Sequence, residues 1–421
     1  MEGQIRILHV LGRLDRGGAE TMVMNLYRHM DRNRIQFDFV IHTEDVCDYT
    51  EEVKRLGGKI YSMKPFRAST AARYCGQWRR FFERHPEYRV VHGHMRSTAS
   101  LYLREAKKAG LVTIAHSHNT SSGKGFSALV KNILQYPLRF QADYLFACSR
   151  GAGVWLYGKR ACKGIKFHLL LNGIEPEAFR FDARRREEKR REMTAPKDSG
   201  RAGAGDMQSP GEAPVFLHIG RMETQKNHAF LLRIMKEVVN GCPQARLWLC
   251  GVGPLEDELK KQVGTLGIET QVRFLGMRTD VPELMQAADG VIFPSLFEGL
   301  PVTLIEAQAA GLPVLMSDTI TEEVILTGLV RTMPLSETPG TWAEEALRMT
   351  GGGELGDALR VAEDGKTDAA LRNAEGGRRE AYADVIGRSG YDVAENAKKL
   401  ERFYEDAVLR RAGGEKRDRK S

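Results

Sequence analysis

Residues 215–251, VFLHIGRMETQKNHAFLLRIMKEVVNGCPQARLWLCG, decide the fold of this chain. The apolar run VFLHIG ends in a glycine and a polar loop, and LLRIMKEVVNG then follows with apolar residues at helical spacing. ARLWLCG is a second short apolar run. A strand, a helix and another strand in this order predict a parallel βαβ unit.

The same alternation runs through most of the sequence. Seven runs before residue 182 predict strands: IRILHVLG, QFDFVIHT, KIYSM, VVHGH, VTIAHSH, YLFACS and KFHLLLNG. Residues 19–30, 69–84, 97–109 and 126–140 predict helices between them. After residue 251, VRFLG, GVIFPS, PVLMS and GLVRTM continue the strand pattern. The fold class expected is therefore α/β, with two doubly wound Rossmann-like domains facing a cleft.

A change in composition separates the two domains. We predict a first domain over 1–181, a flexible linker or insertion over 182–214, and a second domain over 215–391. The run ARRREEKRRE at 183–192 is expected to be solvated. The helix predicted over 392–409 has apolar spacing suited to packing back on the first domain.

Composition excludes several classes of protein. The 421 residues carry 63 basic and 55 acidic side chains, a net charge of +8, but no helix-turn-helix, zinc-finger or RNP-like pattern, so nucleic acid is not an expected partner. No run of 18 apolar residues or cleavable signal pattern occurs. Six scattered cysteines without CxxC pairs indicate neither zinc nor disulfides. We expect a cytoplasmic protein.

Two loops that follow strands could hold phosphate. HVLGRLDRGGAETMVMNL places Gly17 and Gly18 before a helix, and LHIGRMETQKNH places Gly220, Arg221 and Lys226 in a similar turn. Glycine allows close approach of a phosphate, helix N-termini offer unpaired N–H groups, and the two cations could clamp a diphosphate. Neither loop is a GxGxxG or Walker motif, so an ordinary strand–helix turn is the alternative.

Two carboxylates stand in the apolar stretch FPSLFEGLPVTLIEAQAAGLPVL, residues 293–315. Glu298 lies in the predicted loop, and Glu306 lies in the helix expected to begin at Pro301. A carboxylate can accept two hydrogen bonds from a vicinal diol, as in ribose or a hexose. The alternative is a helix N-cap region followed by a solvated glutamate.

The order and spacing of many short motifs resemble the retaining nucleotide-sugar glycosyltransferases of family four, which have the GT-B fold. The motifs are GGAE, VVHGH, AHSHNT, ADYLFACS, LLNGIE, IGR with QK, LCGVGPLEDEL, VRFLGMRTDVPELMQAADGVIFPS and FEGLPVTLIEAQAAGLPV. They cover most of the chain, and HSHNT with ACS is most similar to the exopolysaccharide and capsule branch.

The resemblance implies a role for each candidate residue. Glu298, helped by the N–H groups of Gly299 and Leu300, would bind the donor sugar, and Glu306 would bind the ribose. Arg221 and Lys226, beside Gly220, would neutralise the diphosphate, and Gly17 and Gly18 would add N–H groups from the other domain. No DxD motif stands in a metal-binding setting, so neither a metal nor another cofactor is expected.

Four histidines form the pairs VVHGH and AHSHN. His116 and His118 end a predicted strand and share one face. The resemblance implies that one of them, His118 first and His116 as the alternative, contacts the donor sugar near its 6-hydroxyl. A metal is disfavoured because no acidic or cysteine partner follows at ligand spacing. His92 and His94 are interpreted as structural or acceptor-side residues.

The expected function is transfer of a hexosyl unit from a nucleoside-diphosphate sugar, with UDP as the expected nucleotide, to a saccharide or lipid-linked saccharide. The alternatives are a GT-B nucleotide-sugar epimerase, a synthase acting on soluble acceptors, and a noncatalytic sugar-nucleotide-binding protein. The basic, apolar segment 123–139 predicts peripheral contact with the inner face of the plasma membrane. A helix that only covers the sheet is the other interpretation.

Overall fold

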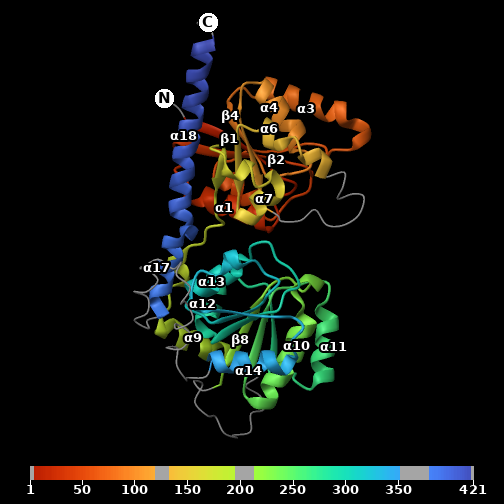
Figure 1. Ribbon diagram of the computed structural model, residues 1–421, viewed down its shortest axis with the longest axis vertical. Helices are drawn as coiled ribbons and strands as arrows, with labels where there is room; N and C mark the ends of the chain where they lie inside the picture. The colour runs from red at the N-terminus through yellow and green to blue at the C-terminus, as the bar shows by residue number, and fades with distance from the viewer. Residues whose placement is uncertain (1–3, 119–131, 195–212, 351–378, 419–421) are drawn as a thin grey trace. The chain divides into compact units, whose positions relative to one another are not determined.

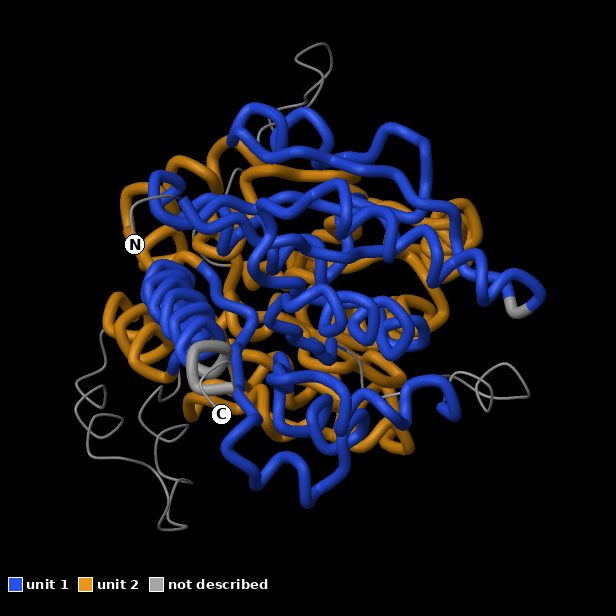
Figure 2. The backbone as a smooth tube through the Cα atoms, turned by 90° about the horizontal axis from the view of Figure 1, so that it is seen from above, with its two compact units in different colours: residues 1–174, 390–421 blue, residues 175–389 orange. Residues whose placement is uncertain are grey.

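The chain divides into two compact units. The computed structural model describes residues 4–118, 132–194, 213–350 and 379–418. Unit 1 comprises residues 1–174 and 390–421, and unit 2 comprises residues 175–389 (Figure 2). The second unit is therefore an insertion in the first, and the first domain ends earlier than residue 181, the boundary predicted from the sequence.

Unit 1 is built on a seven-stranded parallel sheet. Its order is β3-β2-β1-β4-β5-β6-β7, and Figure 1 labels β1, β2 and β4 of this sheet. The strands are β1 (Ile5–Val10), β2 (Ile35–Ile41), β3 (Ile60–Ser62), β4 (Tyr88–Gly93), β5 (Val112–Ser117), β6 (Tyr144–Ala147) and β7 (Phe167–Leu169). Every residue of β2 and β5 is buried, as expected for strands covered on both faces.

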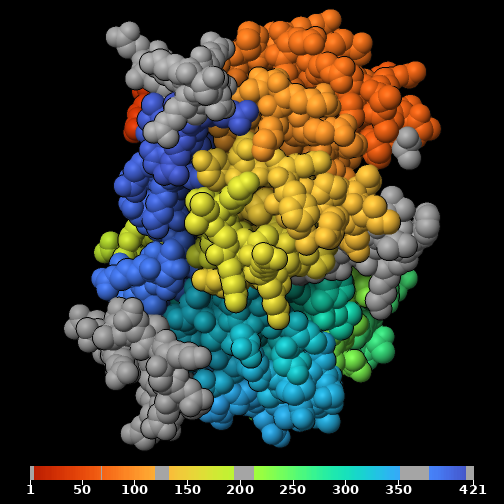
Figure 3. All heavy atoms as spheres, turned by 45° about the horizontal axis from the view of Figure 1, so that its top comes forward, coloured from red at the N-terminus to blue at the C-terminus, as the bar shows by residue number. Residues whose placement is uncertain are grey.

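Helices cover this sheet, and one comes from the far end of the chain. They are α1 (Gly18–His29), α2 (Thr50–Arg55), α3 (Ala71–Arg84), α4 (Ala99–Lys108), α6 (Leu138–Gln141), α7 (Arg150–Tyr157) and α18 (Val393–Asp418). The last of these packs along α1, and its Leu400 and Tyr404 are buried in the same core as Phe37 of β2. In Figure 3 the blue C-terminal helix forms a continuous surface with residues of the first half of the chain.

Unit 2 repeats the architecture with a six-stranded parallel sheet of order β10-β9-β8-β11-β12-β13. The strands are β8 (Val215–Ile219), β9 (Arg246–Cys250), β10 (Val272–Gly276), β11 (Gly290–Phe293), β12 (Val314–Ser317) and β13 (Val330–Met333). The helices are α8 (Pro176–Phe179), α9 (Ala183–Thr194), α10 (His228–Gly241), α11 (Glu256–Leu266), α12 (Val281–Ala287), α13 (Val302–Ala309), α14 (Pro339–Thr350) and α17 (Tyr382–Ile386).

Strand order reverses once in each sheet, between β1 and β4 in unit 1 and between β8 and β11 in unit 2. At such a switch point the connections leave toward opposite faces, and a crevice opens at the carboxyl ends of the strands. The prediction of two doubly wound α/β domains is confirmed, and the stretch 215–251 is the β8-α10-β9 unit.

The prediction that 183–192 belongs to a flexible linker is wrong, although most of its side chains are exposed as expected. These residues belong to α9, which packs on α12. Arg186 and Arg190 both donate to the Asp289 carboxylate, and only 7% of the Arg190 side chain is exposed. The charge run has no apolar period because its basic side chains bind carboxylates and carbonyl oxygens of unit 2, a partner that spacing alone cannot show. Residues 195–212 lie outside the described part.

A second correction concerns the helix predicted over 126–140. Residues 119–131, which include Lys124, Lys131, Phe126, Leu129 and Val130, lie outside the described residues. Beyond them the chain is helical at 132–135, turns at Tyr136 and Pro137, and enters the short helix α6. Proline disfavours helical backbone in the residue before it, so one continuous helix does not form through Pro137.

The Arg190–Asp289 contact should be a main determinant of the stability of unit 2. Asp289→Ala removes the acceptor of two arginines and of the Val215 N–H, and leaves the mostly buried Arg190 guanidinium without its carboxylate. Breaking a buried pair in this way costs about 3–5 kcal/mol. We expect a loss of that order in urea unfolding followed by circular dichroism.

The matched control lies on the same helix. Glu187 pairs with Arg191, and both side chains are about 70% exposed. Glu187→Ala should change the unfolding free energy by less than about 0.5 kcal/mol. Equal effects of the two substitutions would show that α9 is not held by Asp289.

Candidate functional site

The loop after β8 carries the lysine of the predicted clamp. Lys226 ends the 3₁₀ turn Thr224–Lys226, and its stem crosses Gly220, where a Cβ atom would lie 3.0 Å from Lys226 Cε. The ammonium group stands 2.8 Å from Glu298 Oε1 and 4.7 Å from the centre of the Phe293 ring. A side chain at Gly220 would press on the lysine stem.

Two side chains that the sequence analysis did not single out fix the loop that carries Glu298. Gln225 Nε2 donates to the Phe297 carbonyl at 2.9 Å and to Glu298 Oε2 at 3.1 Å. Asn227, in the left-handed region with φ 55°, donates from Nδ2 to the Pro294 carbonyl at 3.0 Å. A signal for Asn227 was present, because asparagine adopts the left-handed conformation several times more often than most residues. Together these bonds join the ends of β8 and β11 at the switch point of unit 2.

Glu306 stands on α13, and its carboxylate is isolated. The helix is anchored through buried Gln308, whose Nε2 donates to the Leu304 and Val324 carbonyls and whose Oε1 accepts from the Thr327 N–H. Within the described residues no hydrogen bond or ion pair reaches the Glu306 carboxylate. Burial raises its pKa to about 7. A carboxylate partly removed from water and without a cation beside it is suited to hydroxyl donors from a ligand.

The other predicted residues of unit 2 lie in the same region. Gly299 and Leu300 are half-buried between the Glu298 loop and α13. Arg221 is mostly exposed and pairs with Glu223 at 2.9 Å, so the two predicted clamp cations bind different carboxylates. Pro301 is the extended N-cap residue of α13 and not its first helical residue, because its ψ is 102°.

Gly17 and Gly18 begin α1 in unit 1 as predicted, but their amides are not equivalent. The Gly17 N–H donates to the Asp15 carbonyl at 2.8 Å, so it is already bonded. The Glu20 carboxylate lies over Gly17, where it would collide with a Cβ atom. Space around Gly18 is open. Of the two predicted N–H groups, the Gly18 N–H is therefore the better placed for an anion.

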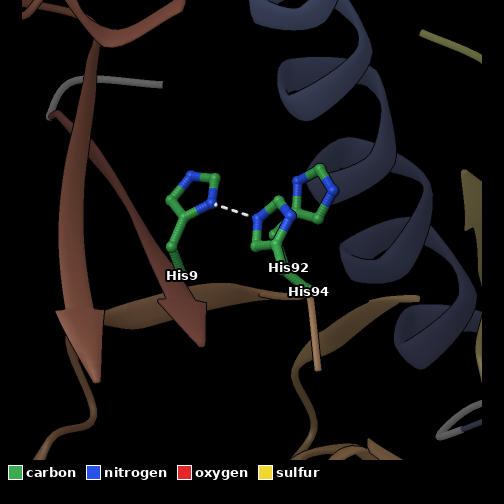
Figure 4. A group of neighbouring side chains, drawn as sticks. All are labelled: His9, His92 and His94. Carbon is green, nitrogen blue, oxygen red and sulfur yellow. Dashed lines mark hydrogen bonds between the residues drawn. The ribbon is translucent and has the colours of Figure 1, made fainter. Parts of the chain in front are cut away.

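Five histidine rings meet at the switch point of unit 1. His9 comes from β1, His92 and His94 from β4 and its end, and His116 and His118 from β5 and its end. One chain of hydrogen bonds runs from His9 Nδ1 to His94 Nε2 at 2.9 Å and from His94 Nδ1 to His118 Nε2 at 2.8 Å. Figure 4 shows the first of these bonds, with His92 beside it.

A second chain starts at the C-terminal helix. Tyr404 Oη and His92 Nδ1 lie 2.7 Å apart, and His92 Nε2 and His116 Nδ1 lie 3.0 Å apart. Burial lowers the pKa of all five rings, to about 3 for His9 and His118, so they are neutral at pH 7. His92 and His94 were expected to be structural or acceptor-side residues, and His9 was not predicted, because its position beside His92 is set by the strand register.

A cavity of about 280 Å³ borders this cluster. His94, His116, His118, Arg96 and Trp155 line it, and the Arg96 guanidinium lies 5.0 Å from the centre of the Trp155 ring. His116 is 2% exposed and His118 is half-buried. Of the two histidines proposed for the sugar, His118 is therefore the more accessible.

Two units, each a doubly wound parallel sheet with polar groups at its switch point, have the GT-B fold. Comparison with known proteins gives the family. The model described as Glycosyltransferase Family 4 matches residues 16–178, and the model described as Glycosyl transferases group 1 matches residues 213–350. A Bacillus subtilis protein named as the glycosyltransferase EpsF is 34% identical to this chain over 406 residues. The match covers 95% of this chain and 96% of EpsF. The chain belongs to this family of glycosyltransferases.

A further relative and a solved structure are also similar to this chain. An Escherichia coli protein named UDP-Gal:alpha-D-GlcNAc-diphosphoundecaprenol alpha-1,3-galactosyltransferase is 25% identical over 243 residues, 55% of this chain and 58% of that protein. Crystal structures of Anabaena HepE with UDP and glucose superpose with a TM-score of 0.68 at 16% identity, covering 96% of this chain and all of HepE. At this identity the likeness shows the fold alone. No helix among the described residues is long and apolar enough to cross a membrane.

The raised pKa of Glu306 gives a pH-dependent prediction. The folded chain holds this proton up to about pH 7, whereas an unfolded glutamate releases it near 4.5. Stability should therefore fall as pH rises between these values, by up to about 3 kcal/mol. Glu306→Gln should remove this loss, measured as urea unfolding of unit 2 between about pH 5 and about pH 7.5.

The control is Glu258→Gln, an exposed carboxylate of α11 in the same unit. This variant should keep the pH dependence of the wild type. If Glu306→Gln loses stability with pH as the wild type does, Glu306 ionises normally and is not isolated.

Proposed function

We propose that the chain transfers a hexosyl unit from a nucleoside-diphosphate sugar, with UDP as the nucleotide, to a saccharide or lipid-linked saccharide in cell-surface or exopolysaccharide biosynthesis, with retention of configuration. Three findings support the donor and pathway. They are the family, the UDP named with the Anabaena structures, and the lipid-linked substrate named for the Escherichia coli relative.

The observation that carries the proposal is the Lys226–Glu298 pair beside isolated Glu306. Both members of the pair are mostly buried, with side chains 17% and 9% exposed. A bound diphosphate would form an ion pair with Lys226 in place of Glu298. The Glu298 carboxylate would then accept hydrogen bonds from the sugar hydroxyls. Glu306 would accept from the ribose diol. The apo pair thus keeps each charge compensated until the donor supplies both replacements.

The reaction requires stabilisation of the leaving diphosphate. In the proposed front-face mechanism, the bond from the anomeric carbon to the phosphate oxygen breaks while the acceptor hydroxyl attacks from the same side and gives its proton to that phosphate. Lys226, with Arg221, would neutralise the developing charge, and no resident metal is needed at the diphosphate. Neutral His118, with His116 behind it, would orient the sugar through a hydrogen bond near the 6-hydroxyl.

The division of labour between the glutamates can be tested by calorimetry. Glu306→Gln should weaken both UDP and the intact donor, because both contain ribose. A hydrogen bond to a charged group contributes about 1.5–3 kcal/mol, roughly a tenfold to hundredfold change in Kd. Glu298→Gln should leave bare UDP binding within about threefold and weaken or prevent turnover of the donor. Glu258→Gln is the matched control.

The same variants test the function itself. A panel of UDP- and GDP-sugars is incubated with the wild type, with and without saccharide or undecaprenyl-diphosphate-linked acceptors. Acceptor-dependent release of UDP, lost in Glu298→Gln, is the expected result. Donor isomerisation without transfer would indicate the epimerase, and binding without turnover would indicate a noncatalytic protein. Equal loss of bare UDP affinity in both variants would contradict the roles of the glutamates.

A peripheral membrane contact is proposed for the same unit that carries the histidines. Ile133, Tyr136 and Phe140 are 64%, 57% and 67% exposed, and the Arg139 guanidinium lies 4.3 Å from the centre of the Tyr136 ring. Exposed aromatic and aliphatic side chains next to a basic residue are suited to the interface of an anionic bilayer. A lipid-linked acceptor would be reached from this surface.

Replacing Ile133 and Phe140 by serine should release the chain from vesicles that contain anionic phosphatidylglycerol, measured by sedimentation. Activity on lipid-linked acceptors should fall while UDP binding persists. The control is Val46→Ser with Ile165→Ser, which removes two apolar side chains of unit 1 that are 81% and 97% exposed elsewhere. If both double variants sediment as the wild type does, this surface is not the membrane contact.

A further inference from the structure

Three aromatic rings of unit 2 lie next to the side chain of Lys226. The Lys226 ammonium nitrogen is 4.7 Å from the centre of the Phe293 ring. The His218 ring stacks on Phe293, with ring centres 5.1 Å apart and planes inclined by 24°. The His228 ring meets His218 in a T-shaped contact at 4.6 Å. None of these three rings was predicted to be a site residue, and no step of the proposed reaction uses them.

The two histidines are buried and uncharged. His218 and Phe293 are fully buried, and His228 is 2% exposed. His218 Nδ1 lies 2.9 Å from the Ile292 carbonyl oxygen, which can only accept, so Nδ1 carries the proton and Nε2 keeps the lone pair. No described residue bonds to His218 Nε2. Burial lowers the pKa of both histidines, to about 4 for His228, so both rings are neutral at pH 7. A buried polar atom without a partner calls for an explanation, because leucine would fill an apolar strand without one.

We propose that Phe293 is a positioning residue of the donor site, whose ring binds the Lys226 ammonium group through a cation–π contact and keeps it in place when a diphosphate replaces Glu298. His218 supports the ring from the neighbouring strand. This role rests on the proposed function, in which Lys226 neutralises the diphosphate.

The contact has the geometry of a cation–π interaction. A cation within about 6 Å of a ring centre is attracted by the negative face of the ring, and the attraction grows where water is excluded. The Lys226 side chain is only 17% exposed. Its other partner, Glu298 at 2.8 Å, is proposed to turn to the sugar when the donor binds. Phe293 is buried in β11 and cannot leave, so it is the partner that Lys226 keeps in both states.

His218 fixes the plane of the Phe293 ring. It comes from β8, which pairs with β11, and its Nδ1 donates to the carbonyl of the residue that precedes Phe293. Stacking on His218 then limits rotation of the Phe293 ring. His228, the first residue of α10, packs against His218 two positions after Lys226. The turn that carries the lysine is therefore anchored to the same group of rings.

The test replaces Phe293 by phenylalanines that carry one, two or three fluorine atoms on the ring. Fluorine withdraws electrons from the ring face and weakens its attraction for a cation, while the size of the side chain changes little. We expect the Kd for UDP, measured by calorimetry, to rise stepwise and to reach roughly threefold to thirtyfold with three fluorines. Uridine, which has no phosphate, should bind unchanged. His218→Leu should also weaken UDP binding and spare uridine.

Controls show whether the effect passes through the lysine. The same fluorinated residues at Phe216, another buried ring of unit 2, should leave the Kd for UDP unchanged. In a Lys226→Met background, fluorination of Phe293 should no longer change the Kd. A ring that served only to fill the core would give the same response with or without the lysine.

A second measurement needs no nucleotide. Trifluorinated Phe293 should lower the urea midpoint of unfolding in the wild type more than in Lys226→Met, and this difference reports the contact in the free protein. Absence of the difference would overturn the proposal, as would a UDP affinity that does not respond to fluorination. Unchanged UDP binding in His218→Leu would overturn the supporting role of the histidine. If the difference is present but the wild type binds no UDP, the proposed function fails and the contact stands.

Discussion

The reversal of strand order in each parallel sheet is the constraint on which the rest of the structure depends. Because β1 and β4 send their connections to opposite faces, no crossover helix covers the ends of these two strands, and the same holds for β8 and β11. The histidines occupy the first of these positions, and Lys226 with Glu298 occupies the second. The candidate site residues thus lie at the carboxyl ends of the strands, where the backbone leaves room for a ligand, whereas the strands themselves are mainly apolar.

Unit 2 contains two groups of buried charged side chains that differ in how completely they are paired. Around Asp289, two arginines of α9 and the Val215 N–H donate to the carboxylate, so its charge is compensated within the protein. At the strand ends, Lys226 and Glu298 compensate each other, but Glu306 has no such partner among the described residues, and burial raises its pKa to about 7. A fully satisfied ion cluster stabilises the fold. An incompletely satisfied one marks the place where binding energy can be gained.

Most of the fold was predictable because parallel strands buried on both faces leave near-continuous apolar runs in the sequence. Glu298, Glu306 and Lys226 were singled out from the sequence, but the contact of Lys226 with Glu298 was not predicted, and their roles toward a donor stay predictions. The contacts of α9 were not, because a run of charges has the same composition whether it is solvated or bound to Asp289. His9 was not predicted either, because its neighbours are set by strand register, which joins positions 83 residues apart. The interruption of the predicted helix 126–140 at Pro137 follows from the backbone restrictions of proline, but it was not predicted.

The position of α18 has a consequence for synthesis of the chain. Its Leu400 and Tyr404 complete the core of unit 1 against residues of β2, and Tyr404 also holds His92. A ribosome delivers β1 to β7 first and then all of unit 2, so the apolar surface beneath α18 stays uncovered until α18 itself emerges. Unit 2 has all its strands in one continuous segment and can fold earlier. The N-terminal half of the protein is therefore the last to mature, and truncated chains would carry a finished second unit beside an unfinished first.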